Sequence, residues 1–189
     1  MSSGTCNHPQ LFRKKILEYQ TDEFGIPLLL IDAAEADVCE VCGKQLRIEI
    51  DNLTGVIAAA AIARATHPQK LSGREIRFLR KALKWSAKKL GEVLDSKPET
   101  VSRWEHDRLP MSSNSEKLLR LLTCTTLSPQ APAIAHATDE ILQMRIPAVH
   151  ELKESVQLRL QRVLCVTPPN KVPAAAYIRA VEDTRRLAA

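Results

Sequence analysis

The chain has 189 residues, room for one large domain or two small ones, and its six glycines and 4% aromatic residues disfavour a many-turned all-β fold. Its net charge of +5 is unevenly distributed along the sequence. Residues 1–69 contain six Lys/Arg and nine Asp/Glu (net −3), residues 70–123 contain thirteen Lys/Arg and seven Asp/Glu (net +6), and residues 124–189 contain eight Lys/Arg and six Asp/Glu (net +2). The basic middle segment has phosphate as a natural partner, although a solvated lysine-rich helix face would give the same count.

The longest apolar run near the start, Leu28–Ile31, is too short for a secretion signal or a membrane span. We therefore expect a cytoplasmic protein that has no membrane partner. In a reducing compartment, the five cysteines are expected to be metal ligands or buried thiols rather than disulfides. Cys124 and Cys165 lie at the ends of apolar segments and are expected to be buried.

The N-terminal residues predict a small β-structure followed by a helix. The runs 12–20 and 26–31 flank a turn-like segment and predict a β-hairpin, and Leu46–Ile50 alternates apolar and charged residues as a short strand does. Alanine, the best helix former, dominates residues 55–66, which predict a helix capped by Thr54.

Two residue pairs in this region supply four donors for a structural metal site. Cys39 and Cys42 form a C-x-x-C pair, and Gly43 permits the tight turn that follows. Cys6 and His8 form a C-x-H pair thirty residues upstream. These four donors suit a tetrahedral Zn²⁺, and a zinc ion with four protein ligands has no open position for catalysis. The alternatives are a redox pair or a reduced, metal-free pair.

After a predicted linker at 67–70, residues 72–122 predict four or five short helices. Ser72 opens the first with a capping-box pattern, Ser86 caps the second, and the third runs over Pro98–Glu105 because proline suits the first turn of a helix. A three-residue turn separates the second helix from the third. This arrangement predicts a helix-turn-helix.

The third helix has an inner and an outer face. Val101 and Trp104 are spaced to point inward, which leaves a polar side for solvent. A helix fits the major groove of DNA, where an arginine fork bonds to guanine and a glutamate accepts from cytosine. The residues predicted on the DNA-facing side are Lys97, Glu99, Thr100, Ser102 and Arg103. Those predicted to grip the phosphate backbone are Lys88, Lys89 and Arg108.

Residues 72–122 resemble the phage repressor and Cro type of helix-turn-helix. The runs PETVSRWE and SEKLLRLL are more closely similar to the C-terminal domain of the MqsA family of antitoxins. Gly91 stands where this family has a small residue between two helices. Asp95 replaces a glycine in a left-handed turn, Lys97 replaces a capping Ser or Thr, and Ala87 replaces a phosphate-binding Gln.

The N-terminal residues are similar to the zinc domain of the same family, in which two cysteine pairs flank a hairpin. Pro9 occupies the position of the second cysteine of the first pair, so the resemblance implies His8 as the substitute ligand. In the family, this domain binds and neutralises a toxin that cleaves mRNA, and the complex represses its own operon. An acidic N-terminal third would suit a basic nuclease partner.

The elements together predict a mainly α chain in three parts. A zinc-binding α+β domain with a hairpin and a linking helix covers 1–69, a five-helix-type helix-turn-helix domain covers 70–123, and a linker with a helical extension covers 124–189. In the extension, helices are predicted near 138–146, 149–165 and 173–187. One of them would carry Leu152, Val156 and Val163 along one face.

The pattern predicts a sequence-specific regulator of transcription that binds a double-stranded operator as a homodimer. The resemblance implies an antitoxin with a toxin partner; the alternative is a stand-alone regulator. No phosphate-binding loop, Ser/His/Asp set or paired carboxylates favour an enzyme. RNA binding would require exposed aromatic side chains for base stacking, and Trp104 is expected to point inward.

Overall fold

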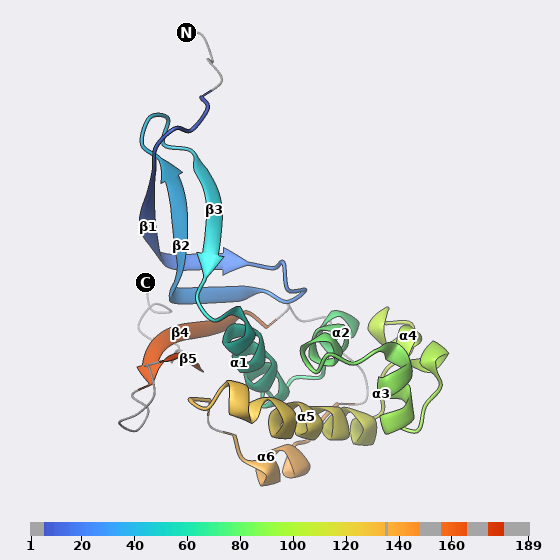
Figure 1. The fold of residues 1–189 in the computed structure, drawn as a ribbon. Coiled ribbons are helices and arrows are strands. Elements are labelled where there is room, and N and C mark those ends of the chain that lie inside the picture. The colour runs from blue at the N-terminus through green and yellow to red at the C-terminus, as the bar shows by residue number, and fades with distance from the viewer. Residues whose placement is uncertain (1–5, 135, 148–155, 166–173, 180–189) are drawn as a thin grey trace, which may run out of the picture.

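The computed structural model describes residues 6–134, 136–147, 156–165 and 174–179. Its strands form one five-stranded sheet, with helices packed beside it (Figure 1). The strands are β1 (Leu11–Thr21), β2 (Leu28–Cys39), β3 (Gln45–Ile50), β4 (Leu158–Cys165) and β5 (Ala174–Arg179). The helices are α1 (Leu53–Ala65), α2 (Gly73–Ala82), α3 (Ala87–Val93), α4 (Pro98–Glu105), α5 (Ser113–Leu127), η1 (Ser128–Gln130) and α6 (Thr138–Gln143). None of the helices described here is long and apolar enough to span a bilayer.

Strand β2 is the centre of the sheet, and the predicted hairpin that it forms with β1 is confirmed. Along its other edge, β4 pairs parallel with residues 28–31, and β3 pairs antiparallel with residues 34–38. The strands bend between these two parts, where the β1–β2 register shifts and Asp32 has φ 54°. The bend sends the outer part of the sheet away from the helices (Figure 1). We call this part, residues 6–16 and 34–50, the arm.

The inner part of the sheet packs against α1. Leu28 and Leu30 of β2, and Leu158 and Leu160 of β4, are all at most 2% exposed. Every second residue of a strand points to the same side, so both pairs of leucines face one core. All the alanines of α1 are buried in that same core, and their small side chains let the helix lie close to the strands.

Helix α1 begins earlier than the sequence predicts. Asn52 is the N-cap, with φ 48°, and its side-chain Oδ1 accepts from the backbone N–H of Gly55 at 3.1 Å. The prediction that Thr54 caps this helix is therefore wrong. Asparagine tolerates the left-handed conformation, so it caps the helix and turns the chain out of β3 at the same position.

The prediction of a helical C-terminal extension is wrong over most of the described residues. Residues 158–165 and 174–179 are strands β4 and β5, and only α6 confirms one of the predicted helices. Val163 lies in β4, so it shares no helical face with Val156, and Leu152 lies outside the described residues. One of the two partners of β4 is β2, near the other end of the chain, and local periodicity carries no sign of such a distant pairing.

Helix α5 continues to Leu127, beyond the predicted end at residue 122, and η1 follows it. Residues 124–130 are therefore not the linker that the sequence predicts. Cys124 lies within α5 and is 1% exposed, which confirms that it is a buried thiol, and burial raises its pKa to about 11. The side chain of Cys165 lies outside the described residues.

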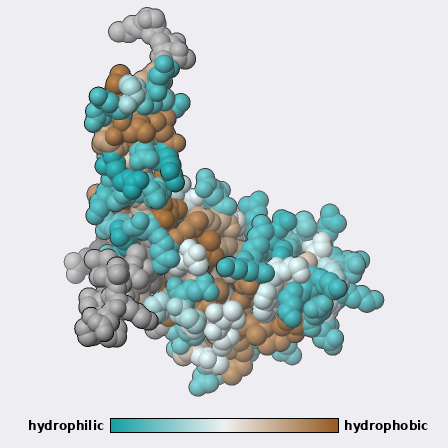
Figure 2. Space-filling view, viewed as in Figure 1, coloured by the Kyte–Doolittle hydropathy of each residue, from teal (hydrophilic) through white to brown (hydrophobic). Residues whose placement is uncertain are grey.

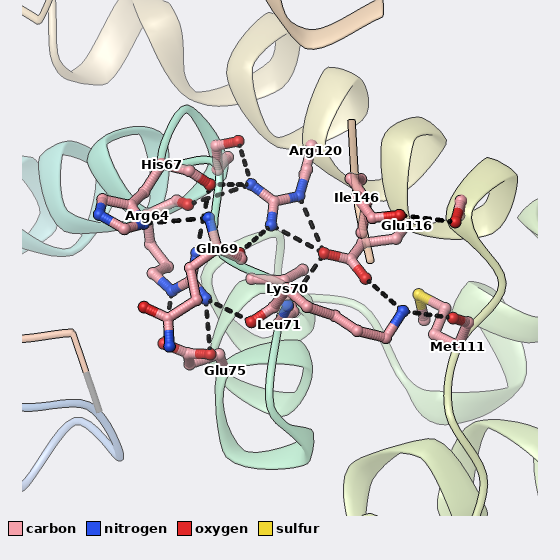
Figure 3. Close-up of polar contacts among 12 residues, drawn as sticks. Arg64, His67, Gln69, Lys70, Leu71, Glu75, Met111, Glu116, Arg120 and Ile146 are labelled. Carbon is pink, nitrogen blue, oxygen red and sulfur yellow. Dashed lines mark hydrogen bonds and ion pairs between the residues drawn. The ribbon is translucent and has the colours of Figure 1, made fainter. Parts of the chain in front are cut away.

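Residues 67–70 leave α1 and reach α2 through a buried polar cluster (Figure 3). Arg64, near the end of α1, donates to both carboxylate oxygens of Glu75 in α2 and to the carbonyl oxygens of Gln69 and Lys70. Burial by itself raises the pKa of Glu75, but the bound Arg64 guanidinium outweighs it and lowers the pKa below its usual value. The predicted linker is thus fixed in place by hydrogen bonds from Arg64 to its backbone carbonyl oxygens.

Arg120 of α5 closes the cluster from the other side (Figure 3). Its fully buried guanidinium donates to Glu116 at 2.7 Å and to the carbonyl oxygens of Ala65 at 2.8 Å and Gln69 at 2.7 Å. The Nζ atom of Lys70 lies 3.3 Å from the Glu116 carboxylate. The sheet half and the helices that follow are therefore joined by buried charges.

Replacing Arg120 tests this joint. Arg120→Met leaves Glu116 buried without its main partner, and we expect it to lower the free energy of unfolding by about 3–5 kcal/mol. Arg13→Met is the matched control, because Arg13 also forms several ion pairs but is 56% exposed; we expect a loss of about 0–1 kcal/mol. Urea titrations followed by tryptophan fluorescence measure both. Equal losses would show that the buried cluster is not the main tie.

Candidate nucleic-acid interface and metal centre

Four helices, α2 to α5, make up the predicted helix-turn-helix, and the capping residues of α2 and α3 are those predicted from the sequence. Ser72 and Glu75 form the capping box of α2, and the Ser86 side chain accepts from the backbone N–H of Lys89 at 3.0 Å. Helix α4 runs over Pro98–Glu105 as predicted. Its N-cap, Lys97, makes no side-chain hydrogen bond, so α4 begins with proline at its first position but without a side-chain cap.

The turn between α3 and α4 requires a small residue and a left-handed one. A Cβ atom on Gly91 would lie 2.5 Å from the carbonyl oxygen of Ser96, too close for any side chain without movement of the backbone. Asp95 has φ 48°, the left-handed conformation expected at this position. Gly91 and Asp95 together determine the orientation of α4 relative to α3.

The inner face of α4 is fixed by packing and by charge. Val101 and Trp104 are 0% and 5% exposed, as predicted. At the end of the helix, the buried Glu105 accepts from Arg80 of α2 through both carboxylate oxygens, with the Arg77 guanidinium 3.7 Å away. The sequence does not predict this ion pair, because two charges 25 residues apart give no local signal.

The outer face of α4 is open to solvent. Of the predicted DNA-facing residues, four are exposed and Thr100 is half-buried; the exposed ones are Lys97, Glu99, Ser102 and Arg103. The three predicted phosphate contacts, Lys88, Lys89 and Arg108, are exposed as well. The fold thus places these side chains on the surface of α4 and its neighbours, and none of the five cations among them forms an ion pair with a described carboxylate.

Residues 76–127 match the family model described as helix-turn-helix. They form a helix-turn-helix domain. The match supports a DNA-binding regulator of transcription of the phage repressor and Cro type, and it covers less than a third of the chain. No curated protein and no solved structure was found to match.

The tip of the arm brings together the four predicted metal ligands, Cys6, His8, Cys39 and Cys42. Their donor atoms all lie within 4.8 Å of one another. The Sγ atoms of Cys6 and Cys39 are 3.8 Å apart, and the Sγ atom of Cys42 lies 3.4 Å from Nδ1 of His8. Ligands about 2.3 Å from a tetrahedral metal centre lie about 3.8 Å from one another, so the cluster could hold a metal ion.

The backbone around Cys39 arranges this tip. Cys39 is the last residue of β2, and its carbonyl oxygen accepts from the N–H of Gly43, whose φ of 69° makes the tight turn. The backbone N–H of Cys42 and the His8 side chain stabilise the Cys39 thiolate, and they lower its pKa to about 6. A thiolate at neutral pH is the form that binds a metal.

Gly91 offers a test of how α4 is positioned. Gly91→Ala would press a methyl group into the Ser96 carbonyl, and we expect it to lower the free energy of unfolding by about 1–3 kcal/mol. Glu92→Ala, on the exposed side of the same helix, should change it by less than about 0.5 kcal/mol. Thermal and urea unfolding measure both variants. A neutral Gly91→Ala would mean that α3 and α4 are less closely packed than described.

Proposed function

We propose that this protein is a sequence-specific transcriptional regulator that inserts α4 into the major groove of an operator. The observation that carries the proposal is the α4 surface: a helix anchored from inside by Val101, Trp104 and Glu105 presents polar side chains outward at every exposed position after Pro98. Arg103 would bond to guanine, and Glu99 would accept from cytosine. Thr100 and Ser102 can bond to bases or to phosphates.

The residues around α4 support phosphate binding. Lys88 and Lys89 lie in the first turn of α3, and Arg108 follows α4, so the cations flank the proposed reading helix on both sides in sequence. Lys97 lies at the start of α4 itself. Phosphate contacts fix orientation on the duplex, while base contacts give specificity. The protein would bind as a homodimer, with half-sites about one helical turn, or a multiple, apart.

We further propose that the cluster on the arm holds a structural Zn²⁺. Three thiolates and one imidazole are a usual zinc set, and together they would fill all four positions of a tetrahedral ion, which would leave none for a substrate. Zinc would tie the residues before β1 to the turn after β2 at the tip of the arm, since Cys6 and His8 precede β1, Cys39 ends β2 and Cys42 follows it.

The resemblance to the MqsA family supports a narrower role as an antitoxin that binds an mRNA-cleaving toxin through the arm and represses its own operon. The alternative is a stand-alone regulator. Co-expression with the neighbouring reading frame separates them. Rescue of cells from a toxic neighbour would favour the antitoxin, whereas a harmless neighbour, or no small basic nuclease beside the gene, would favour the alternative.

The base-reading role of Arg103 is tested on a duplex selected by sequencing the genomic fragments that the protein binds. Arg103→Ala should weaken binding by about 1–3 kcal/mol and relax base preference, because one bidentate contact is lost. Arg145→Ala removes the same charge from an exposed position after α6 and should leave affinity unchanged. Fluorescence anisotropy on specific and scrambled duplexes measures both. An equal loss on both duplexes would reduce Arg103 to a phosphate contact.

The zinc assignment is tested by metal content. The protein should carry one zinc ion per chain by mass spectrometry, Cys39→Ser should lose it, and His8→Cys should keep it as a four-cysteine site. Cys124→Ser is the control, because this buried thiol lies in α5 and should not change zinc content. Zinc retained by Cys39→Ser, or absent from the native protein, would contradict the assignment.

A further inference from the structure

The two faces of the arm differ in chemistry. Antiparallel pairing places Phe12 opposite Val38 on one face, and Ile16 opposite Ala34. Ala36 of β2 lies on the same face between these two pairs, and its partner in the neighbouring strand β3 is Ile48. This apolar face of the arm projects from the body of the protein, and the space-filling view shows apolar surface there (Figures 1 and 2).

A groove of about 660 Å³ lies on this apolar face. Its apolar lining includes Phe12, Ile16, Leu17 and Val38, of which Phe12 is 42% and Leu17 is 69% exposed. The small side chain of Ala36 in the middle strand leaves room between its larger neighbours. Beyond β2, β1 makes no extensive packing with another described element. Clustered exposed apolar side chains of this kind are typical of a protein-binding surface.

The charges beside the groove are positive. Lys14 and Lys15 line it, and no acidic residue is among its described lining. Three of the nine acidic residues of the N-terminal third, Glu35, Asp37 and Glu49, surround the Arg13 guanidinium on the opposite face of the arm. The net charge of this third therefore does not describe the groove.

We propose that this groove binds a segment of a partner protein in which apolar side chains alternate with carboxylates. The apolar side chains would fill the groove beside Phe12 and Val38, and the carboxylates would meet Lys14, which pairs with Ala36 on this same face. The inference rests on the proposed function only in assigning partner binding to the arm. It changes the expected partner, because the contact surface of that partner would be acidic rather than basic.

The test uses the full-length, metal-loaded protein and two fluorescent synthetic peptides. One peptide alternates leucine and phenylalanine with glutamate, and the other has lysine in place of each glutamate. Anisotropy should show tighter binding of the acidic peptide. Lys14→Glu should weaken that binding about three- to tenfold, because an attraction becomes a repulsion. Arg47→Glu, on the opposite face of the same sheet, makes the same change of charge and should leave binding unchanged.

Phe12→Ala should also weaken the acidic peptide about tenfold, by removing the largest side chain of the groove. Circular dichroism must show that the three variants remain folded. Equal affinity for the two peptides, no binding of either, or equal effects of Lys14→Glu and Arg47→Glu would overturn the inference. So would sedimentation showing that the wild type self-associates through this face and that Phe12→Ala abolishes it. Operator binding, measured in parallel, distinguishes failure of this inference from failure of the proposed function.

Discussion

The buried cluster of Arg64, Lys70, Glu75, Glu116 and Arg120 is the interaction on which the arrangement of the molecule depends. It brings three cations and two carboxylates out of water, each at most 4% exposed. The free-energy cost of burying a charge without a partner exceeds the stabilisation that a surface ion pair provides. The cluster is therefore stable only if each of its charged groups is hydrogen-bonded. The excess positive charge is met by main-chain carbonyl oxygens at the end of α1 and in residues 67–70, where the negative end of the helix dipole also lies.

These hydrogen bonds connect parts of the fold that are far apart in the sequence. The carbonyl groups that the two arginines bind belong to a segment that would otherwise be an ordinary loop, and the arginines come from α1 and α5. The helix-turn-helix therefore has a fixed orientation relative to the sheet. The same logic recurs on a smaller scale where Arg80 holds Glu105 at the end of α4. In both places a buried carboxylate bound by arginine sets the position of a helix.

Local features of the sequence predicted the parts whose causes are local. The capping of α2 and α3, the limits of α4 and the left-handed turn at Asp95 each depend on residues within a few positions of one another. The metal cluster was predicted from the chemistry and spacing of four residues. In contrast, β4 depends on β2, and the Arg64–Glu75 and Arg80–Glu105 pairs depend on the approach of separate helices. The helix predicted at 149–165 is inferred from the spacing of apolar residues, and this spacing contains no information about a strand partner at the other end of the chain.

The arm connects the proposed zinc to the proposed partner surface. Its buried apolar residues are few and small, chiefly Ala34, Ala36 and Cys39, so the arm has little core to stabilise it. Small units with so little core are usually held by a metal or a disulfide. A zinc ion at the tip would supply that stability without covering the sheet. The apolar face would then remain open, because the arm would not need to bury it to stay folded.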